Sequence, residues 1–139
     1  MQPITDSELP NVAPRVTLAD VEAQIASEHY FLGGDGVYGA AHKNGDHGVQ
    51  SFPAALDLLT FCILTLKNGF TVVGKSAVAS PENFRADIGN RIARENAVDQ
   101  IWPLLGFRLR DRLAREEEMR PTYFVGHPDG TYSAADPQP

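Results

Sequence analysis

The sequence has little of what marks exported, membrane-spanning or disulfide-stabilised proteins. Its single cysteine, Cys62, cannot form a disulfide within the chain. No apolar run reaches the roughly 18 residues that a membrane-spanning helix needs, and the longest lies around Leu58–Leu66. The N-terminus has no basic segment followed by an apolar one, so we expect no export signal and a reducing cytoplasm as the setting.

The charges of the chain are unevenly distributed. The 139 residues carry a net charge of −6, yet residues 85–115 contain seven arginines against four acids. Coating long nucleic acid requires a broad positive surface, so an acidic protein of this kind is not expected to bind it. A small anionic ligand needs far fewer contacts. The competing interpretation is that these arginines form a solvated helix face.

Three parts are expected along the chain. Residues 1–16 contain three prolines and no periodicity, which predicts a mobile N-terminal arm. Residues 17–115 hold the periodic segments of a single domain, and residues 116–139 form an acidic, proline-rich tail. Within that tail, residues 123–125 and 131–132 flank a turn-forming sequence and are candidates for a small hairpin.

The first half of the domain is predicted to contain two helices. Thr17 has the features of a helix N-cap, and the apolar spacing after it predicts a helix of about four turns that ends near Leu32. The glycine-rich residues 33–50 predict a long irregular loop. A second, short helix is expected to begin at Pro53 and to end near Leu59.

A central β-hairpin follows. Residues 60–67 and 70–76 are rich in β-branched and aromatic side chains, and Asn68-Gly69 between them is the strongest short signal for a two-residue turn. That turn would place Thr65 opposite Val72. Both faces of the hairpin are apolar, so we expect it to be covered on both sides or to lie in a homo-oligomer interface. The alternative is a helix through residue 67 that ends at Asn68-Gly69.

Two helices are predicted after the hairpin. The first begins at Ser80 and runs to about Trp102, and Pro103 breaks or kinks it before a second, arginine-rich helix. The pair is expected to form a helical hairpin or an elbow. The predicted fold is therefore α+β, a central β-hairpin with two N-terminal helices and a C-terminal helical pair in a single domain.

The helix over residues 80–102 has two sides that can pack. Its large apolar residues are expected to face the sheet, and its small residues permit close approach of another helix. Asp87 and Glu95 lie with two arginines on the large-residue side, at the spacing of an intrahelical ion-pair ladder. In the functional interpretation, the two guanidinium groups instead bind a phosphate or carboxylate while an aromatic ring stacks on a base. The candidate ligand-binding residues are Arg91, Arg94, Glu95, Trp102 and Phe84.

Catalytic and metal-binding patterns are weak. His42 and His47, with Asp46 beside the second histidine, match no standard ligand spacing, so neither a metal nor another cofactor is expected. Cys62 lies within an apolar strand, where a thiol is normally inert. A small hydrolase that acts through His29, or through the loop with the two histidines, is retained as an alternative.

Several segments resemble one family. They are Glu28-His29-Tyr30-Phe31, the run from Phe61 to Ala77, Ser80-Pro81-Glu82-Asn83-Phe84, Ile88 to Ala97, and Ile101 to Phe107. Together they are similar to the gene 49/gene 66 product family of tailed bacteriophages, over roughly residues 17–115. The resemblance implies a phage or prophage origin and a host-cytoplasm setting. It does not imply a reaction.

The expected function is non-catalytic binding by a phage accessory protein in the infected host. The first hypothesis is capture of a small anionic, nucleotide-like ligand used in host defence. The second is a protein–protein inhibitor or adaptor, for which the same arginine and tryptophan side chains would form an interface hot spot. No membrane partner is expected.

Overall fold

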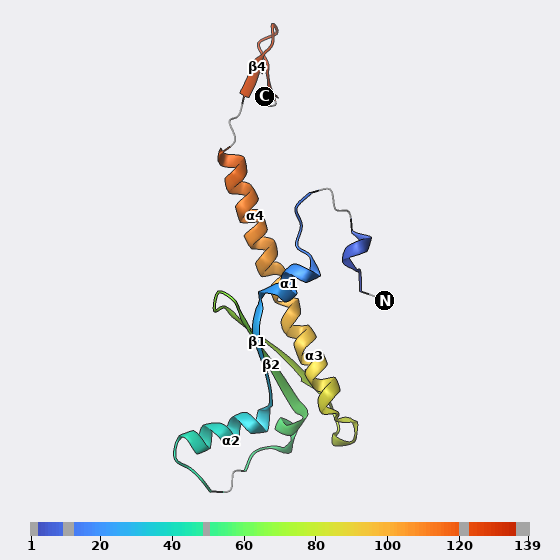
Figure 1. The fold of residues 1–139 in the computed structure, drawn as a ribbon, viewed down its shortest axis with the longest axis vertical. Coiled ribbons are helices and arrows are strands. Elements are labelled where there is room, and N and C mark those ends of the chain that lie inside the picture. Colours follow the sequence, from blue (N-terminus) through green and yellow to red (C-terminus); the bar gives the residue numbers. More distant parts are fainter. Residues whose placement is uncertain (1–2, 10–12, 49–50, 120–122, 136–139) are drawn as a thin grey trace.

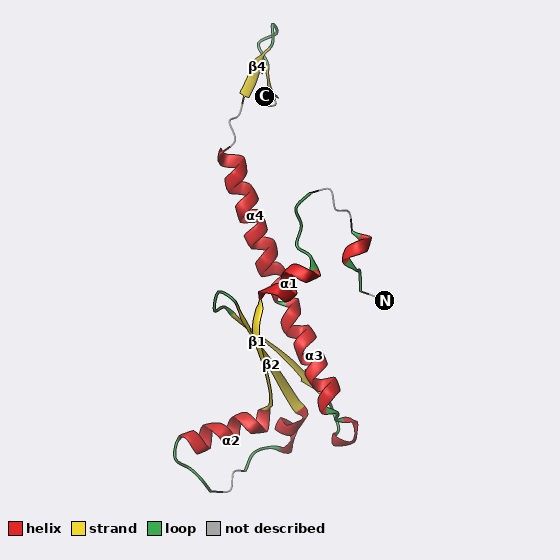
Figure 2. Ribbon diagram, in the orientation of Figure 1, coloured by secondary structure: helices red, strands yellow, loops and turns green. Residues whose placement is uncertain are grey.

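The computed structural model describes residues 3–9, 13–48, 51–119 and 123–135, and its centre is a three-stranded sheet with one helix across it (Figures 1 and 2). The helices and strands are α1 (Leu18–Gln24), β1 (Ile25–Leu32), α2 (Gly33–Lys43), β2 (Leu59–Leu66), β3 (Thr71–Ala77), α3 (Ala86–Asp99), α4 (Ile101–Met119), β4 (Tyr123–Gly126) and β5 (Tyr132–Ala135). Short 3-10 helices occupy Asp6–Glu8, Ala54–Leu58 and Pro81–Asn83. The predicted α+β class is confirmed. No helix of the described residues is long and apolar enough to cross a membrane.

The central hairpin is confirmed, but its register differs by one residue from the prediction. Thr65 lies opposite Thr71 and not opposite Val72. The N–H of Leu66 donates to the carbonyl of Phe70 at 2.7 Å, so the loop has three residues, the last of which is Gly69 with φ of 88°. Three-residue loops of this type place a left-handed residue at the third position, which favours glycine.

The predicted helix over residues 17–32 is wrong in its second half. The chain forms a helix only as far as Gln24, and residues 25–32 form β1, which pairs antiparallel with β2. The predicted N-cap is confirmed, because the Thr17 hydroxyl accepts from the N–H of Asp20 at 3.1 Å. Pairing with a distant strand overrides the helical spacing after Gln24, since aromatic residues such as Tyr30 and Phe31 suit a strand.

The predicted loop over residues 33–50 is also wrong in part, because α2 occupies Gly33–Lys43. The Asp35 carboxylate accepts from the N–H of Leu32 at 2.9 Å and so caps the first turn. Most of α2 is exposed, and it extends from one end of the sheet (Figure 1).

Helices α3 and α4 follow one another with only Gln100 between them. They do not fold back on each other as a hairpin, since α4 continues from the end of α3 away from the sheet (Figure 1). Pro103 explains the break, because its ring has no N–H to donate and collides with the carbonyl four residues earlier, at Asp99.

The side of α3 that packs on the sheet is the small one, contrary to prediction. Gly89, Ala93 and Ala97 are buried, whereas Ile92 is 41% exposed. The helix backbone comes so close to β3 that a Cβ atom on Gly74 would collide with backbone atoms of Ala93 and Ala97. Small residues on both partners therefore bring α3 and the sheet into direct backbone contact.

Polar side chains of α3 occupy the outer edge of β3. The side-chain amide of Asn96 donates to the carbonyl of Lys75 at 2.7 Å, and that of Gln100 donates to the carbonyl of Val73 at 2.5 Å. A free strand edge is a template for pairing with another chain. These two amides partly block that edge.

We expect Gly74→Ala to lower the free energy of unfolding by about 2–3 kcal/mol, because α3 must move away from the sheet to admit the methyl group. The matched control is Gly106→Ala in α4, where a Cβ atom would meet nothing within 4 Å. The control should stabilise the protein by up to about 1 kcal/mol, since alanine is the better helix former. Urea unfolding of both variants measures the difference, and equal stabilities would refute the close-contact argument.

Candidate functional site

Arg94 is the best-connected charged residue among those predicted to bind a ligand. Its Nη1 and Nη2 atoms donate to the two carboxylate oxygens of Glu22 at 3.0 and 2.8 Å, and its Nε atom donates to Glu28 at 2.9 Å. These bonds join α3 to α1 and β1. They raise the pKa of Arg94 and lower the pKa of Glu22. Because the guanidinium is already held by two carboxylates, little of it is available for an external anion.

The predicted ion-pair ladder along α3 does not form. Asp87 pairs with Arg85 at 3.0 Å, and within the described residues neither Arg91 nor Glu95 has an ion pair. Both side chains are exposed on the outer side of α3. They are thus free to meet a partner, but the acid offsets the charge of its neighbour.

The two predicted stacking residues lie apart from this outer side. Trp102 is half-buried and packs against the core from the first turn of α4. It is eleven residues from Arg91, or about 16 Å along a helix. Phe84 lines a different hollow with Ile88 and Ile92, beside β3. The structure therefore does not bring the five predicted residues together.

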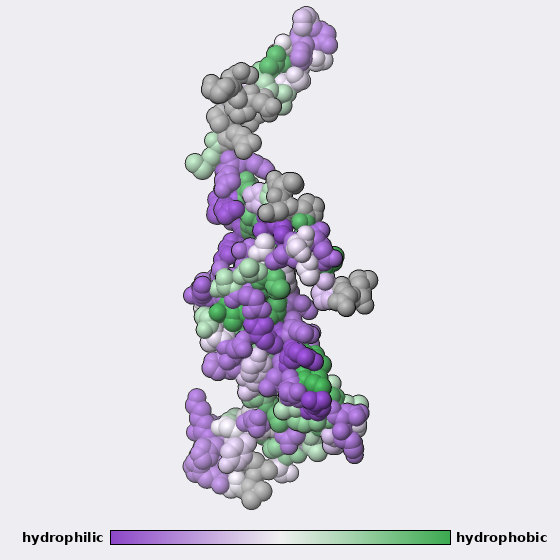
Figure 3. Space-filling view, turned by 45° about the vertical axis from the view of Figure 1, so that its right-hand side comes forward, coloured by the Kyte–Doolittle hydropathy of each residue, from purple (hydrophilic) through white to green (hydrophobic). Residues whose placement is uncertain are grey.

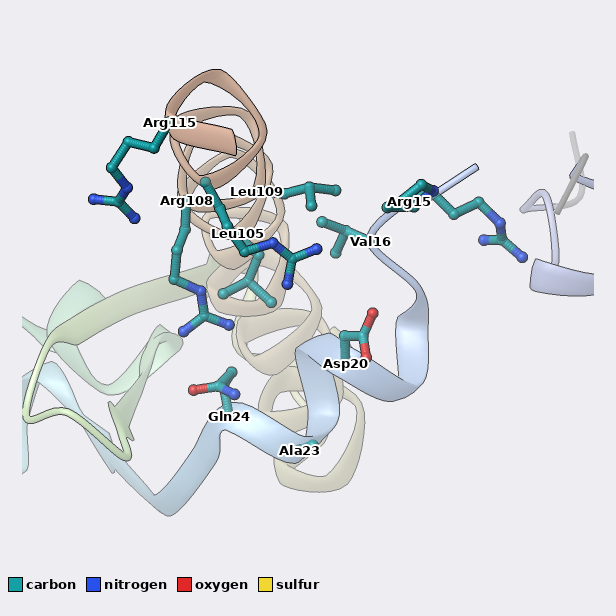
Figure 4. Close-up of a pocket in the computed structure, with 11 residues that line it drawn as sticks. Arg15, Val16, Asp20, Ala23, Gln24, Leu105, Arg108, Leu109 and Arg115 are labelled. Carbon is teal, nitrogen blue, oxygen red and sulfur yellow. The ribbon is translucent and has the colours of Figure 1, made fainter. Parts of the chain in front are cut away.

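A cleft between α1 and α4 is rich in arginine (Figure 4). Its volume is about 540 Å³, within the range of small-molecule sites. Val16, Leu105 and Leu109 supply apolar lining, and the polar lining includes four arginines and two residues of α1. These polar residues are Arg15, Arg108, Arg112, Arg115, Asp20 and Gln24.

Three of the four arginines come from one side of α4. Arg108, Arg112 and Arg115 are spaced by four and three residues, which places them on one face of the helix. Arg108 points across the cleft toward Gln24, whereas Arg115 points away from α1 and pairs with Asp111 at 3.2 Å (Figure 4).

Arg108 and Arg112 are the cations best placed to receive a ligand. Arg108 forms no ion pair with any described residue, and Arg112 approaches Glu116 only at 3.7 Å, too far for a good hydrogen bond. The acid of the opposite wall, Asp20, is engaged by the backbone N–H and the side chain of Thr17, which lower its pKa. Arg15 is turned toward the N-terminal segment, where it donates to the carbonyl of Asp6 at 2.8 Å.

A smaller hollow of about 190 Å³ adjoins the cleft, and Gln24, Leu105 and Arg108 line both. Its other lining residues include Phe70, which is 51% exposed, and Leu104. In the space-filling view, apolar surface gathers near mid-height, whereas the surface around α4 above it is largely hydrophilic (Figure 3). An apolar hollow therefore lies directly beside Arg108, which has no ion pair among the described residues.

The histidines considered for a hydrolase lie at the surface. His29 is exposed on β1, and the Nδ1 atoms of His42 and His47 are 2.9 Å apart on the surface. Within the described segments no three His, Cys, Asp or Glu side chains are grouped to hold a metal ion. Burial raises the pKa of the Cys62 thiol, which disfavours the reactive thiolate.

Comparison with known families supplies the identification. The model of the phage protein (N4 Gp49/phage Sf6 gene 66) family matches residues 16–113. The chain belongs to this family. The match spans the sheet, the arginine pair of the cleft and all of α3, and it confirms the resemblance seen in the sequence. No curated protein and no solved structure matches the chain.

One feature of the sequence indicates the cleft but is not part of the predicted ligand site. The local positive charge of residues 85–115 comes mostly from α4, where four of the seven arginines lie. Their helical spacing was visible, but the wall opposite them was not, because α1 lies more than 80 residues earlier.

We expect Arg94→Met to lower the free energy of unfolding by about 1–2 kcal/mol at neutral pH, since it removes two partly exposed ion pairs. The hydrogen bonds from Arg94 lower the pKa of Glu22. They therefore stabilise the folded protein at pH values above the ordinary glutamate pKa, and this stabilisation is lost as the pH falls through the lowered pKa. Urea unfolding at pH 7 and below pH 4 should therefore show a difference from wild type that shrinks in acid. Arg91→Met, without an ion pair to lose, should match wild type at both pH values. If Arg94→Met and Arg91→Met changed the free energy of unfolding equally, the ion pairs of Arg94 would not be what stabilises the fold.

Proposed function

We propose that this phage protein binds a small anionic ligand with an apolar part, such as a nucleotide, in the cleft between α1 and α4. One observation carries the proposal. Arg108 faces an open cleft without an ion pair to any described residue, next to an apolar hollow, and Arg112 beside it has only a long contact of 3.7 Å with Glu116. Guanidinium groups bind phosphate through paired, charge-assisted hydrogen bonds.

The shape of the site supports a ligand with two chemically different ends. A phosphate group placed between Arg108 and Arg112 leaves a flat, apolar group next to Phe70 and Leu104. Gln24 lies between the two hollows and can hydrogen-bond a polar edge of that group. A nucleotide has this combination of parts, and the combined volume of the two hollows suits a ligand of that size.

The proposal moves the anion site from α3 to α4. On α3, Arg94 is satisfied by Glu22 and Glu28, and Arg91 has Glu95 beside it. Of the five residues predicted from the sequence, none lines the cleft. The anionic ligand class itself is retained, because the same positive segment supplies the cations.

In a phage-infected cell, capture of a nucleotide signal would keep that signal from the host proteins that respond to it. We therefore place the protein among phage accessory proteins that act in the host cytoplasm without catalysis. Sequestration of this kind requires only affinity and sufficient protein, since each bound molecule is removed from the free pool.

The test is a binding experiment on the full chain with pyrophosphate, ADP and cyclic AMP as probes. At least one probe should raise the melting temperature, because a ligand that binds only the folded state stabilises it. By calorimetry, Arg108→Gln and Arg112→Gln should each weaken binding roughly 10- to 100-fold, the range of a lost charge-assisted hydrogen bond. Added salt should weaken binding by the wild type.

Arg110→Gln is the matched control. It removes an arginine of the same helix that does not line the cleft and that pairs with Glu117 at 3.5 Å. Its affinity should stay within about twofold of wild type. No stabilisation by any probe, or equal losses for Arg108→Gln and Arg110→Gln, would refute the proposed site.

A further inference from the structure

Within the described residues, the face of the central sheet opposite α3 is covered only at one end, where Gly36 of α2 lies beside Phe31. Alternate residues of β2 from Thr60 to Leu66 are buried beneath α3, but no strand residue of the opposite face is buried. That face is largely apolar at its centre, where Phe31 and Phe61 stack at 5.4 Å between ring centroids and Val73 is 46% exposed. Its strand residues are Ser27, His29, Phe31, Leu59, Phe61, Ile63, Thr65, Thr71, Val73, Lys75 and Ala77. We call this set the open face.

A second unsupported apolar surface lies on the C-terminal hairpin of β4 and β5. The hairpin's turn is well bonded, with the N–H of His127 donating to the carbonyl of Thr131 at 2.8 Å. Phe124 and Tyr132 share one side of the hairpin in its register and are 67% and 75% exposed. An isolated two-stranded hairpin is marginally stable in water, so a packing partner is needed to hold these rings.

The hairpin cannot cover the centre of its own sheet. From Leu105, which is buried in the core, to Met119 the helix rises about 21 Å. From Leu66 to Phe61, strand β2 runs roughly a further 16 Å the other way. The segment from Met119 to Tyr123 spans at most about 14 Å, and the strands of the hairpin add about 13 Å, so Phe61 is out of reach.

Charge favours the hairpin over a second open face as the occupant. Among the strand residues of the open face, Lys75 is the only charged one, His29 is titratable, and there is no acid. Two open faces in contact would bring like charges together. The hairpin, β4 and β5 with their turn, carries one acid, Asp129, and no lysine or arginine. It therefore complements the open face in polarity, and its one acid opposes the charge of Lys75.

We propose that two copies of the chain form a dimer by reciprocal exchange, in which the C-terminal hairpin of each copy packs on the open face of the other. Each buried aromatic ring contributes about 150–250 Å². Because these rings are 67% and 75% exposed, the two rings of each hairpin, counted in both copies and matched by equal area on the two sheets, add roughly 800–1,400 Å², which reaches the lower end of the range of specific interfaces. This contact leaves the cleft between α1 and α4 outside the interface, so it does not depend on the proposed ligand.

Sedimentation equilibrium of the full chain tests the exchange. The wild type should have a mass near twice 15.2 kDa at micromolar concentration. The double variant Phe124→Ser/Tyr132→Ser, which alters the hairpin, and Val73→Asp, which places an acid on the open face, should each weaken dimerisation at least tenfold. Phe107→Ser is the control, because it removes a ring on α4 that is 77% exposed and lies on neither surface. Circular dichroism establishes that each variant is folded.

Mixing the two dimerisation variants distinguishes the exchange from other contacts. The double hairpin variant retains an intact open face, and Val73→Asp retains an intact hairpin, so one of the two contacts can form between them and a heterodimer should appear. A dimer of two open faces would be disrupted by Val73→Asp alone and would not be restored by mixing. A wild type that sediments as a 15.2 kDa monomer, or a mixture that yields no heterodimer, would overturn the proposal.

Discussion

The contact between the backbone of α3 and β3 at Gly74 fixes the arrangement of the whole domain. Because Gly74 has no side chain and Ala93 and Ala97 have small ones, the helix lies directly on the sheet. This seating determines which way every other side chain of α3 points. Asn96 and Gln100 reach the edge of β3 on one flank, and Arg94 reaches α1 and β1 on the other. The two flanks are joined by directional polar bonds, while the centre is held by close apolar packing.

The same packing of α3 on the sheet explains why the arginines of residues 85–115 have different surroundings on α3 and on α4. The arginine on α3 that faces the domain is neutralised by two glutamates, since α1 and β1 both pass beside it. Beyond the break at Gln100 the chain leaves the sheet as α4, and α1 lies opposite the arginines of α4 that line the cleft. Among the described residues that line the cleft, Asp20 is the only acid, and its oxygens accept bonds within its own capping turn. Among the described residues that line this cleft, Arg108 is therefore the cation without an ion pair.

Local signals in the sequence predicted the elements whose partners are close in the chain. The β2–β3 hairpin is joined by one turn, the Thr17 cap acts three residues away, and Pro103 breaks the helix nearby. The failures involve partners far along the sequence. The local pattern predicts a helix over β1 because the strand that pairs with it, β2, follows some 30 residues later in the sequence. The bonds of Arg94 to Glu28 and Glu22 span 66 and 72 residues, so no helical wheel of α3 contains them.

The wrong prediction of which side of α3 faces the sheet explains why the proposed ligand site lies on α4 and not on α3. A side of glycine and alanine was expected to meet another helix, and a side of large residues was expected to meet the sheet. The sheet, however, presents Gly74 at the crossing, and a matching helix gains more contacts from close approach than from a few large side chains held at a distance. With the small side inward, the outer charges of α3 face solvent in a convex surface. A ligand site requires concavity, which this fold provides where α1 ends at Gln24 and α4 rises past it.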